Sequence, residues 1–288
     1  MTALWLIPLL LLVLIFALGE GISYRLTSRR APNERRSPGE YGLTFEEVQF
    51  PSRDGLMLGG WWIPAKGSTR TVVFLHGHGG SMDPDVQYAP AMNAAGFNVM
   101  MFDFRGHGRS QGDFVSVGYL ERQDVLGALD WLAQHGQERA GLLGFSMGGA
   151  AAMLTAPIAP QVPAIVSDGG PARLTSAIIG GLVEAHVPRW AARPIAWLAV
   201  LFTSWRLGAN LFAYEPIRWV GKIAPRPVFF IHGGRDPYLA PGEFEALVAA
   251  ASEPKQVWRV EEAPHREVDL TAPEEYRRRI VEFFDRWL

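Results

Sequence analysis

The sequence predicts an α/β fold in which a mostly parallel central sheet is covered by helices on both faces. Three observations lead to this prediction. From residue 44 onward, short apolar runs alternate with longer runs of helical character. The apolar runs are continuous, which is typical of parallel strands buried on both faces. The 288 residues are 48% hydrophobic and 19% charged, which is enough apolar material for a sizeable core.

The predicted elements follow one another in a regular order. A hairpin with the turn Pro51-Ser52-Arg53-Asp54-Gly55 opens the domain, and strands and helices then alternate. In such open sheets, ligands bind beyond the carboxyl ends of the strands. The predicted strands are Thr44–Phe50, Leu56–Ile63, Thr71–Leu75, Phe97–Phe104, Ala140–Gly144, Ala164–Ser167, Pro227–Ile231 and Gln256–Val260. The predicted helices are Pro90–Ala95, Val117–His135, Met147–Ala156, Pro241–Ala251 and Pro273–Leu288.

The N-terminal segment is separate from this domain. Ala3 to Gly19 carries no charge and lies near the lower limit of the roughly 17–25 residues that cross a bilayer. A cleaved signal peptide competes with this interpretation, since Ala17-Leu18-Gly19 is acceptable as a cleavage site, but the basic n-region is missing. We therefore predict that residues 1–22 are a transmembrane anchor or an uncleaved signal segment, and that the membrane is a partner of this chain.

The arginines that follow this segment predict its orientation. No lysine or arginine precedes the apolar run, whereas five arginines follow it closely. They are Arg25, Arg29, Arg30, Arg35 and Arg36. By the positive-inside rule, the domain after the anchor lies on the cytoplasmic side of the membrane. Residues 23–42 are rich in Arg, Pro, Ser and Glu and are predicted to be a linker, and residues 43–288 form the domain.

The regular alternation stops between Gly170 and Lys222. Two apolar helical runs, Leu174–Val183 and Trp190–Phe202, occupy this stretch, which is too long for a simple connection between a strand and a helix. Arg193 and Pro194 interrupt the second run, so a second membrane span is disfavoured. We predict a helical cap inserted at about residues 171–221, lying over the strand ends.

Composition excludes several classes of function. The net charge of −2 provides no electrostatic footprint for nucleic acid. The absence of cysteine excludes disulfides and thiolate metal sites, and it is compatible with either an oxidising or a reducing compartment. Nothing in the sequence determines the oligomeric state.

Gly144-Phe145-Ser146-Met147-Gly148 is the most informative motif. It follows a predicted strand and precedes a helix rich in small residues. A sharp turn of this kind needs glycine two positions on either side of the serine, and it exposes the hydroxyl at the N-terminus of the helix. Because Gly-x-Ser-x-Gly also arises by chance, the motif needs a base, an acid and an oxyanion site at the positions that this geometry requires.

Candidates for the base and the acid follow the last two strands. A serine hydroxyl is a poor nucleophile until a base takes its proton. His265 follows the last predicted strand, and Asp236 follows the strand before it. The order serine, aspartate, histidine is the order of the nucleophile-elbow architecture. Each of the two residues has a structural explanation of its own, as a surface loop residue or a turn former.

An oxyanion hole requires two convergent backbone N–H groups. The amide of Met147, directly after the serine, is one candidate, and the amide of His78 in His76-Gly77-His78-Gly79-Gly80 is the other. A phosphate cradle is an alternative for this loop, but the lysine and Ser/Thr of such a loop are missing. A metal site of His76, His78 and His107 is a second alternative, without a convincing carboxylate ligand. We predict no metal and no cofactor.

These motifs resemble the α/β-hydrolase superfamily across residues 43–288. The segment Asp103-Phe104-Arg105-Gly106-His107-Gly108-Arg109-Ser110-Gln111-Gly112 is similar to one that is frequent in monoglyceride-lipase-like, serine-aminopeptidase-like and BEM46-like members. The resemblance implies that Asp103, Arg105 and His107 shape a loop beside the site and take no part in catalysis. It also supports the inserted cap. It favours Asp236 over Asp168, the other acid that follows a strand.

The expected function is that of a serine hydrolase acting on a small-molecule carboxylic ester through an acyl-enzyme intermediate. The apolar cap and the anchor suggest a lipophilic acyl group. A serine peptidase or aminopeptidase-like hydrolase is an alternative, since such relatives share the motifs. A non-catalytic, membrane-tethered binding protein with the same fold is another. Haloalkane dehalogenase chemistry is disfavoured, because it places aspartate where this chain has Ser146.

Overall fold

The computed structural model describes residues 6–32 and 35–288 and contains an eight-stranded sheet. The order of the strands is β1-β2-β4-β3-β5-β6-β7-β8. β2 pairs antiparallel with β1 and β4, and all the other pairs are parallel. The strands are β1 (Glu46–Pro51), β2 (Met57–Ile63), β3 (Thr71–Leu75), β4 (Asn98–Phe102), β5 (Gly141–Phe145), β6 (Ile165–Asp168), β7 (Val228–Gly233) and β8 (Lys255–Val260). The predicted α/β fold with a mostly parallel sheet is confirmed.

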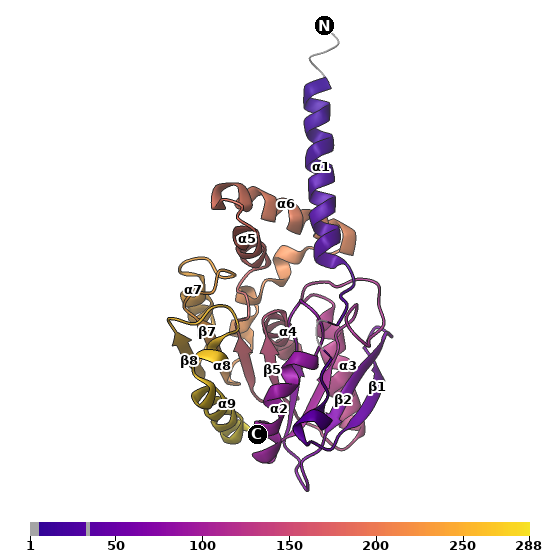
Figure 1. Cartoon of the computed structure of the whole chain (residues 1–288), viewed down its shortest axis with the longest axis vertical. Coiled ribbons are helices and arrows are strands. Elements are labelled where there is room, and N and C mark those ends of the chain that lie inside the picture. Colours follow the sequence, from indigo (N-terminus) through magenta and orange to yellow (C-terminus); the bar gives the residue numbers. More distant parts are fainter. Residues whose placement is uncertain (1–5, 33–34) are drawn as a thin grey trace.

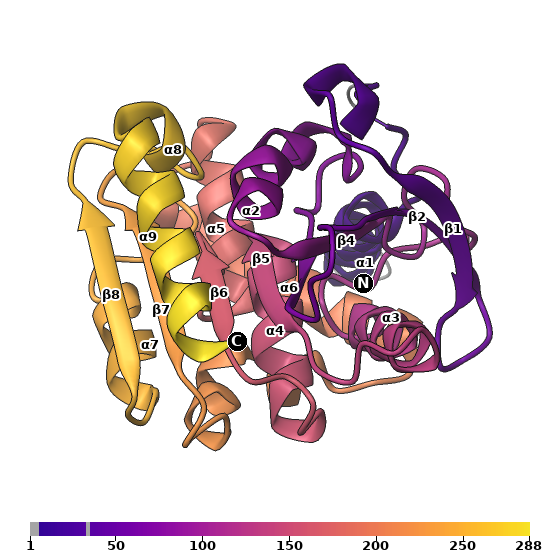
Figure 2. The same ribbon diagram turned by 90° about the horizontal axis from the view of Figure 1, so that it is seen from below.

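The central strands are apolar throughout because both of their faces are covered. Every residue of β3, β4 and β5 is buried. Successive side chains point to opposite faces, so Val73 and Leu75 belong to one core cluster, and Val72 and Phe74 to the other. Figure 2 shows the two helical layers on either side of the sheet. One layer contains α3 (Glu121–Gln134), α4 (Met147–Thr155) and α7 (Glu243–Ala250), and the other contains α2 (Ala89–Ala94), α8 (Val268–Thr271) and α9 (Pro273–Trp287).

A helical insertion lies between β6 and β7. It contains α5 (Leu174–Glu184) and α6 (Arg189–Leu207), followed by the short turns η4 (Leu211–Tyr214), η5 (Pro216–Arg218) and η6 (Val220–Lys222). Figure 1 shows α5 and α6 beyond one end of the sheet, on the side from which α1 projects. The insertion occupies the stretch in which the sequence predicts a cap.

The N-terminal helix α1 (Leu6–Thr27) projects from the body of the molecule, and its lower part is packed on α6 (Figure 1). Gly19 lies against the ring of Phe202 so closely that a Cβ atom there would come within 2.5 Å of it. Glu20 forms an ion pair with Arg206. Ile7–Thr27 is long and apolar enough to cross a membrane, although a signal sequence would show the same features.

The segment predicted as a linker, residues 23–42, is partly helical and partly docked on the domain. α1 continues to Thr27, beyond the predicted boundary at residue 22. The amide of Arg30 donates to Gly106 O at 2.7 Å, and the guanidinium of Arg29 donates to Gly112 O at 2.6 Å. Composition does not predict these bonds, because they depend on the contact between this segment and a loop distant in sequence.

Candidate active site

Ser146 occupies a strained turn between β5 and α4. Its backbone has φ 51° and ψ −112°, which is unusual for a residue with a side chain. A Cβ at Gly144 would lie 2.3 Å from Gly148 O, and a Cβ at Gly148 would lie 1.8 Å from Leu75 O. Backbone atoms therefore leave no room for a side chain at either glycine, because this turn brings α4 directly against the end of β3.

Three predicted residues meet at the carboxyl ends of the strands. The hydroxyl of Ser146 lies 3.0 Å from Nε2 of His265. On the other side of the ring, Nδ1 of His265 lies 2.6 Å from Oδ2 of Asp236. Oδ1 of Asp236 accepts a hydrogen bond from the amide of Tyr238 at 2.8 Å, which orients the carboxylate. A proton on Nδ1 leaves Nε2 free to accept the serine proton.

Asp168 lies nearby but has different partners. Its Oδ2 accepts from Arg266 at 2.5 Å and from the hydroxyl of Tyr276 at 2.6 Å. Burial raises the pKa of the Asp168 carboxyl, and the charge of Arg266 opposes this. Arg266 also binds Asp85 and lies 4.0 Å above the ring of Phe145. Asp236 therefore accepts the hydrogen bond from Nδ1 of His265, while Asp168 belongs to a buried ion-pair cluster beside it.

The loop that follows β3 lies against the Ser146 turn. A Cβ at Gly77 would be 3.6 Å from the Cβ of Ser146. Nε2 of the His78 imidazole lies 2.9 Å from Leu26 O, and the His78 carbonyl oxygen lies 3.2 Å from Nε2 of His107. Burial lowers the pKa of His78 to about 4. His78, Ser146 and Met147 line the same cavity, and Met147 is the first residue of α4.

His76 positions this loop from within the core. It is 1% exposed, its Nε2 accepts from the amide of Phe104 at 2.9 Å, and its Nδ1 lies 2.7 Å from Gly77 O. Burial lowers the pKa of His76 well below its ordinary value. Among residues 6–32 and 35–288, no cluster of three His, Asp or Glu side chains is arranged to hold a metal ion.

The segment from Asp103 to Gly112 is held by ion pairs and lies beside the loop that follows β3. Arg105 is buried and binds Asp54 at 2.6 Å and Asp124 at 2.7 Å. Asp103 accepts from the amides of Met82 and Arg109, both at 2.8 Å. These side chains fix the shape of the loop, and they satisfy one another's charges.

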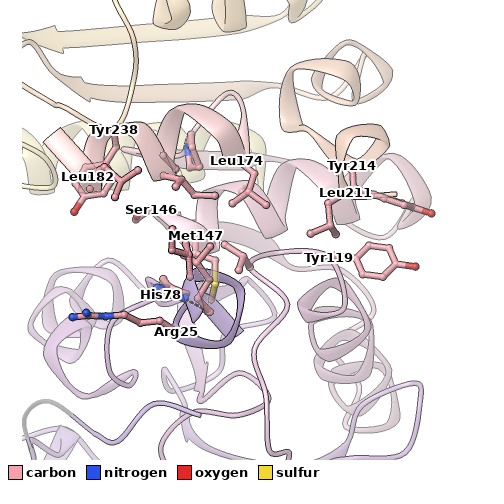
Figure 3. A pocket seen from close by; sticks show the side chains of 18 of the residues that line it. Arg25, His78, Tyr119, Ser146, Met147, Leu174, Leu182, Leu211, Tyr214 and Tyr238 are labelled. Carbon is pink, nitrogen blue, oxygen red and sulfur yellow. Dashed lines mark hydrogen bonds between the residues drawn. The ribbon is translucent and has the colours of Figure 1, made fainter. Parts of the chain in front are cut away.

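Ser146 and Met147 face a cavity of about 660 Å³ between the sheet and the cap (Figure 3). Figure 3 shows Leu174 and Leu182 of α5 on one side of Ser146, and His78 and Arg25 on the other. Most of the other lining side chains are aliphatic or aromatic. They include Ala17, Leu18, Ile22, Leu26, Val117, Tyr119, Ala150, Leu154, Pro171, Ala177, Ile178, Ala185, Leu211, Tyr214, Pro216 and Tyr238.

Sequence analysis missed two groups of residues at this cavity. The first is the lower part of α1, which contributes one wall from Ala17 to Leu26. The second is Tyr238. Its ring lies 4.4 Å from that of His265, and its hydroxyl donates to Glu184 of α5 at 2.6 Å. The position of Tyr238 just after Asp236 is a signal that could have found it. The apolar N-terminal segment carries no local signal that it also lines a cavity.

Solved structures similar to this chain include an esterase of Pyrococcus furiosus, Pf2001. It is 27% identical, has a TM-score of 0.76, and the match covers 90% of this chain and 98% of the esterase. Among curated proteins, YfhR of Escherichia coli K12 is 26% identical over 83% of this chain and 80% of its own length. The alpha/beta hydrolase domain-containing protein WAV2 of Arabidopsis thaliana is 23% identical over 87% and 82%, respectively.

The strand order, the turn at Ser146 and the similarity to the solved structure of Pf2001 define the protein as an α/β hydrolase. Residues 67–225, more than half of the chain, match the family described as serine aminopeptidase S33, and the chain belongs to that family.

Proposed function

We propose that this chain is a membrane-anchored serine esterase that cleaves carboxylic esters with lipophilic acyl groups. The observation that carries the proposal is the line of hydrogen bonds from Ser146 through His265 to Asp236 at the floor of a largely apolar cavity. The similarity to an esterase of known structure supports the same class of reaction.

In the proposed reaction, the Ser146 hydroxyl attacks the acyl carbonyl while Nε2 of His265 takes the proton. The N–H groups of Met147 and His78 stabilise the negative charge on the carbonyl oxygen. His265 then gives its proton to the alcohol as the ester C–O bond breaks. A water molecule, deprotonated by His265, attacks the acyl-enzyme, and the acid leaves as Ser146 recovers its proton.

The lining of the cavity favours an ester over a peptide with a free amino terminus. An aminopeptidase must neutralise the substrate ammonium, for which a carboxylate is the usual partner. Among the described residues that line the cavity, none is Asp or Glu, whereas Arg25 and Arg30 both are present. The aminopeptidase alternative therefore lacks a recognisable site for its ammonium group in this cavity.

The anchor and its orientation are part of the proposal. α1 would hold the protein to the membrane, and the arginines after it would keep the domain on the cytoplasmic side. The packing of α1 against α6 and its place in the cavity wall support an uncleaved segment. Cleavage after Gly19 would remove Ala17 and Leu18 from the lining.

Covalent labelling by a fluorophosphonate tests the hydrolase assignment. Wild type should be labelled, and Ser146→Ala should not; equal labelling of the two proteins, or no labelling of wild type, overturns the proposal. A panel of p-nitrophenyl esters of increasing chain length, compared with aminoacyl-naphthylamides, tests the substrate class. Rates should favour the longer esters, and a preference for the amides would replace the esterase assignment with a peptidase.

A further inference from the structure

α6 exposes a row of large apolar side chains. Trp190, Trp197, Leu201 and Trp205 are 80%, 60%, 56% and 69% exposed, respectively. Their spacings of seven, four and four residues place them on one face of the helix. The opposite face is buried and made of small residues, which include Ala192, Ala196, Ala199, Val200 and Thr203. Four large, exposed apolar side chains along one face of a helix indicate an interaction surface.

This exposed face is continuous with the apolar surface of α1. The ring of Phe16 lies 5.2 Å from that of Phe202 and 6.3 Å from that of Trp205. The described side chains of α1 above this level are apolar and exposed. The first charged residue of the helix, Glu20, is paired with Arg206 of α6. α6 therefore crosses α1 at the level at which α1 stops being apolar (Figure 1).

If α1 crosses a bilayer, the level at which it stops being apolar is the level at which it leaves the hydrocarbon core. Residues 6–19 of a helix extend about 20 Å at 1.5 Å per residue, and the sequence before them is uncharged. The end of the apolar stretch then lies at the boundary between the hydrocarbon and the headgroups, where tryptophan side chains are enriched. Arg189 and Arg193, which are exposed on α6, suit the phosphates at the same depth.

We propose that α6 lies in the surface of the bilayer that α1 enters, with Trp190, Trp197 and Trp205 among the lipid headgroups. This proposal rests on the membrane anchor proposed above. α6 is interrupted by charges and does not cross the membrane; it lies parallel to the surface as an amphipathic helix. Ala17 and Leu18, at the upper end of the cavity wall formed by α1, then lie at the boundary of the lipid. A lipophilic ester reaches Ser146 from the membrane without crossing water.

Because the chain has no cysteine, single cysteines can be introduced and labelled with a nitroxide in the full-length protein. Trp197→Cys and Leu201→Cys report on α6, and Val13→Cys reports on the exposed side of α1. Leu270→Cys, at a residue 69% exposed on α8, is the matched control away from α6. The variants are reconstituted in vesicles of phosphatidylcholine and phosphatidylglycerol, and collision rates with oxygen and with a water-soluble nickel chelate are measured.

The expected result is that oxygen collides more often than the nickel chelate at positions 13, 197 and 201, and less often at position 270. If position 13 is in lipid but 197 and 201 are in water, the proposal for α6 fails and the anchor stands. If position 13 is also in water, the anchor itself fails. Shielding of 197 and 201 from both reagents, with broadening between nitroxides, would show a second copy of the chain on this face and overturn the proposal.

Activity provides a second readout that is independent of labelling. Trp190→Ser combined with Leu201→Ser removes two exposed side chains that do not line the cavity. Hydrolysis of a long-chain ester held in vesicles should fall several-fold, while hydrolysis of a short soluble ester should not change. Val257→Ser combined with Leu270→Ser, which also removes exposed apolar side chains, should change neither rate. Equal loss in both double variants, or none in either, contradicts the proposal.

Discussion

At the scale of single residues, the site depends on a few backbone positions that allow no alternative. Ser146 keeps its positive φ because the turn between β5 and α4 is packed directly against the end of β3. The carbonyl of Asp168 accepts a hydrogen bond from the amide of Ser146 at 2.8 Å, which holds the turn from the neighbouring strand. This strain positions the serine hydroxyl beside His265.

The choice between the two nearby carboxylates leads to a prediction. Asp236→Asn should lower kcat by about 10³- to 10⁴-fold while the protein stays folded, because an amide can donate to Nδ1 of His265 and thereby favour the wrong tautomer. Initial rates on a short soluble ester measure this. Asp168→Asn is the matched control: it breaks the ion pair with Arg266 and should lower the melting temperature, with a much smaller loss of kcat. A greater loss of kcat in Asp168→Asn would reverse the assignment of the acid.

At the scale of elements, α1 combines two roles that sequence analysis assigns to separate segments. Its upper part has the composition of a membrane span, and its lower part packs on α6 and lines the cavity. Ser23 is buried between the two helices, where Thr203 and Arg206 donate to its hydroxyl at 3.2 and 3.1 Å. The cap and α1 are therefore one packed unit above Ser146.

Truncations at two points separate these roles. Removal of residues 1–15 takes away most of the apolar span and keeps the wall from Ala17 to Leu26. This variant should become extractable from membranes by alkaline carbonate and should still cleave a short ester. Removal of residues 1–27 also opens the cavity, and kcat/KM for longer esters should fall well below that of the shorter truncation.

The fractionation and the rates can each contradict the expectation. Full-length protein that is already extracted by carbonate would show that α1 is not a membrane span. Equal activity of the two truncations across the ester panel would show that α1 makes no useful contact with the substrate.

At the scale of the whole molecule, the sheet brings groups from distant parts of the chain together at the carboxyl ends of its strands. The loops after β3, β5, β7 and β8 carry His78, Ser146, Asp236 and His265, respectively. Because β3, β5, β6, β7 and β8 are parallel, all these loops lie at the same end of the sheet. The cap covers this end, so the site is enclosed between the sheet and the cap, which come from different segments of the chain.

The buried His76 makes the stability of this assembly depend on pH. Burial lowers its pKa in the folded state, so the neutral ring contributes stability that is fully present above about pH 6.5 and is lost as the pH falls below that value. The contribution falls by at most about 1.4 kcal/mol per pH unit. Urea unfolding of wild type and His76→Gln between pH 7 and pH 5 should show that the difference in the free energy of unfolding narrows toward acid.

Other groups cancel in this comparison. Burial raises the pKa of Asp85 to about 7, so protonation of that carboxyl acts in the opposite direction over the same pH range in both proteins. A difference between wild type and His76→Gln that stays constant from pH 7 to pH 5 would show that His76 is not held neutral by the fold.

Much of the fold can be predicted because its signals are local. Continuous apolar runs such as Thr71–Leu75 identify buried strands, and the two glycines around Ser146 identify the turn. The places of Asp236 and His265 just after strands, in the required order, put both on the list of candidates. The ion-pair cluster of Arg266 with Asp85 and Asp168 was not foreseen, because its members are far apart in the chain and no periodicity relates them.

The sequence by itself determined the class of fold, the strand-to-helix turn at Ser146 and the presence of an apolar segment at the N-terminus, because hydrophobic periodicity and glycine sterics act over a few residues. The resemblance favoured Asp236 over Asp168, and the tertiary structure shows that Asp236 contacts His265. Only the tertiary structure showed that α1 is a wall of the cavity and that α6 turns its tryptophans outward. Each of these depends on contacts between segments that come together only when the sheet and the cap pack.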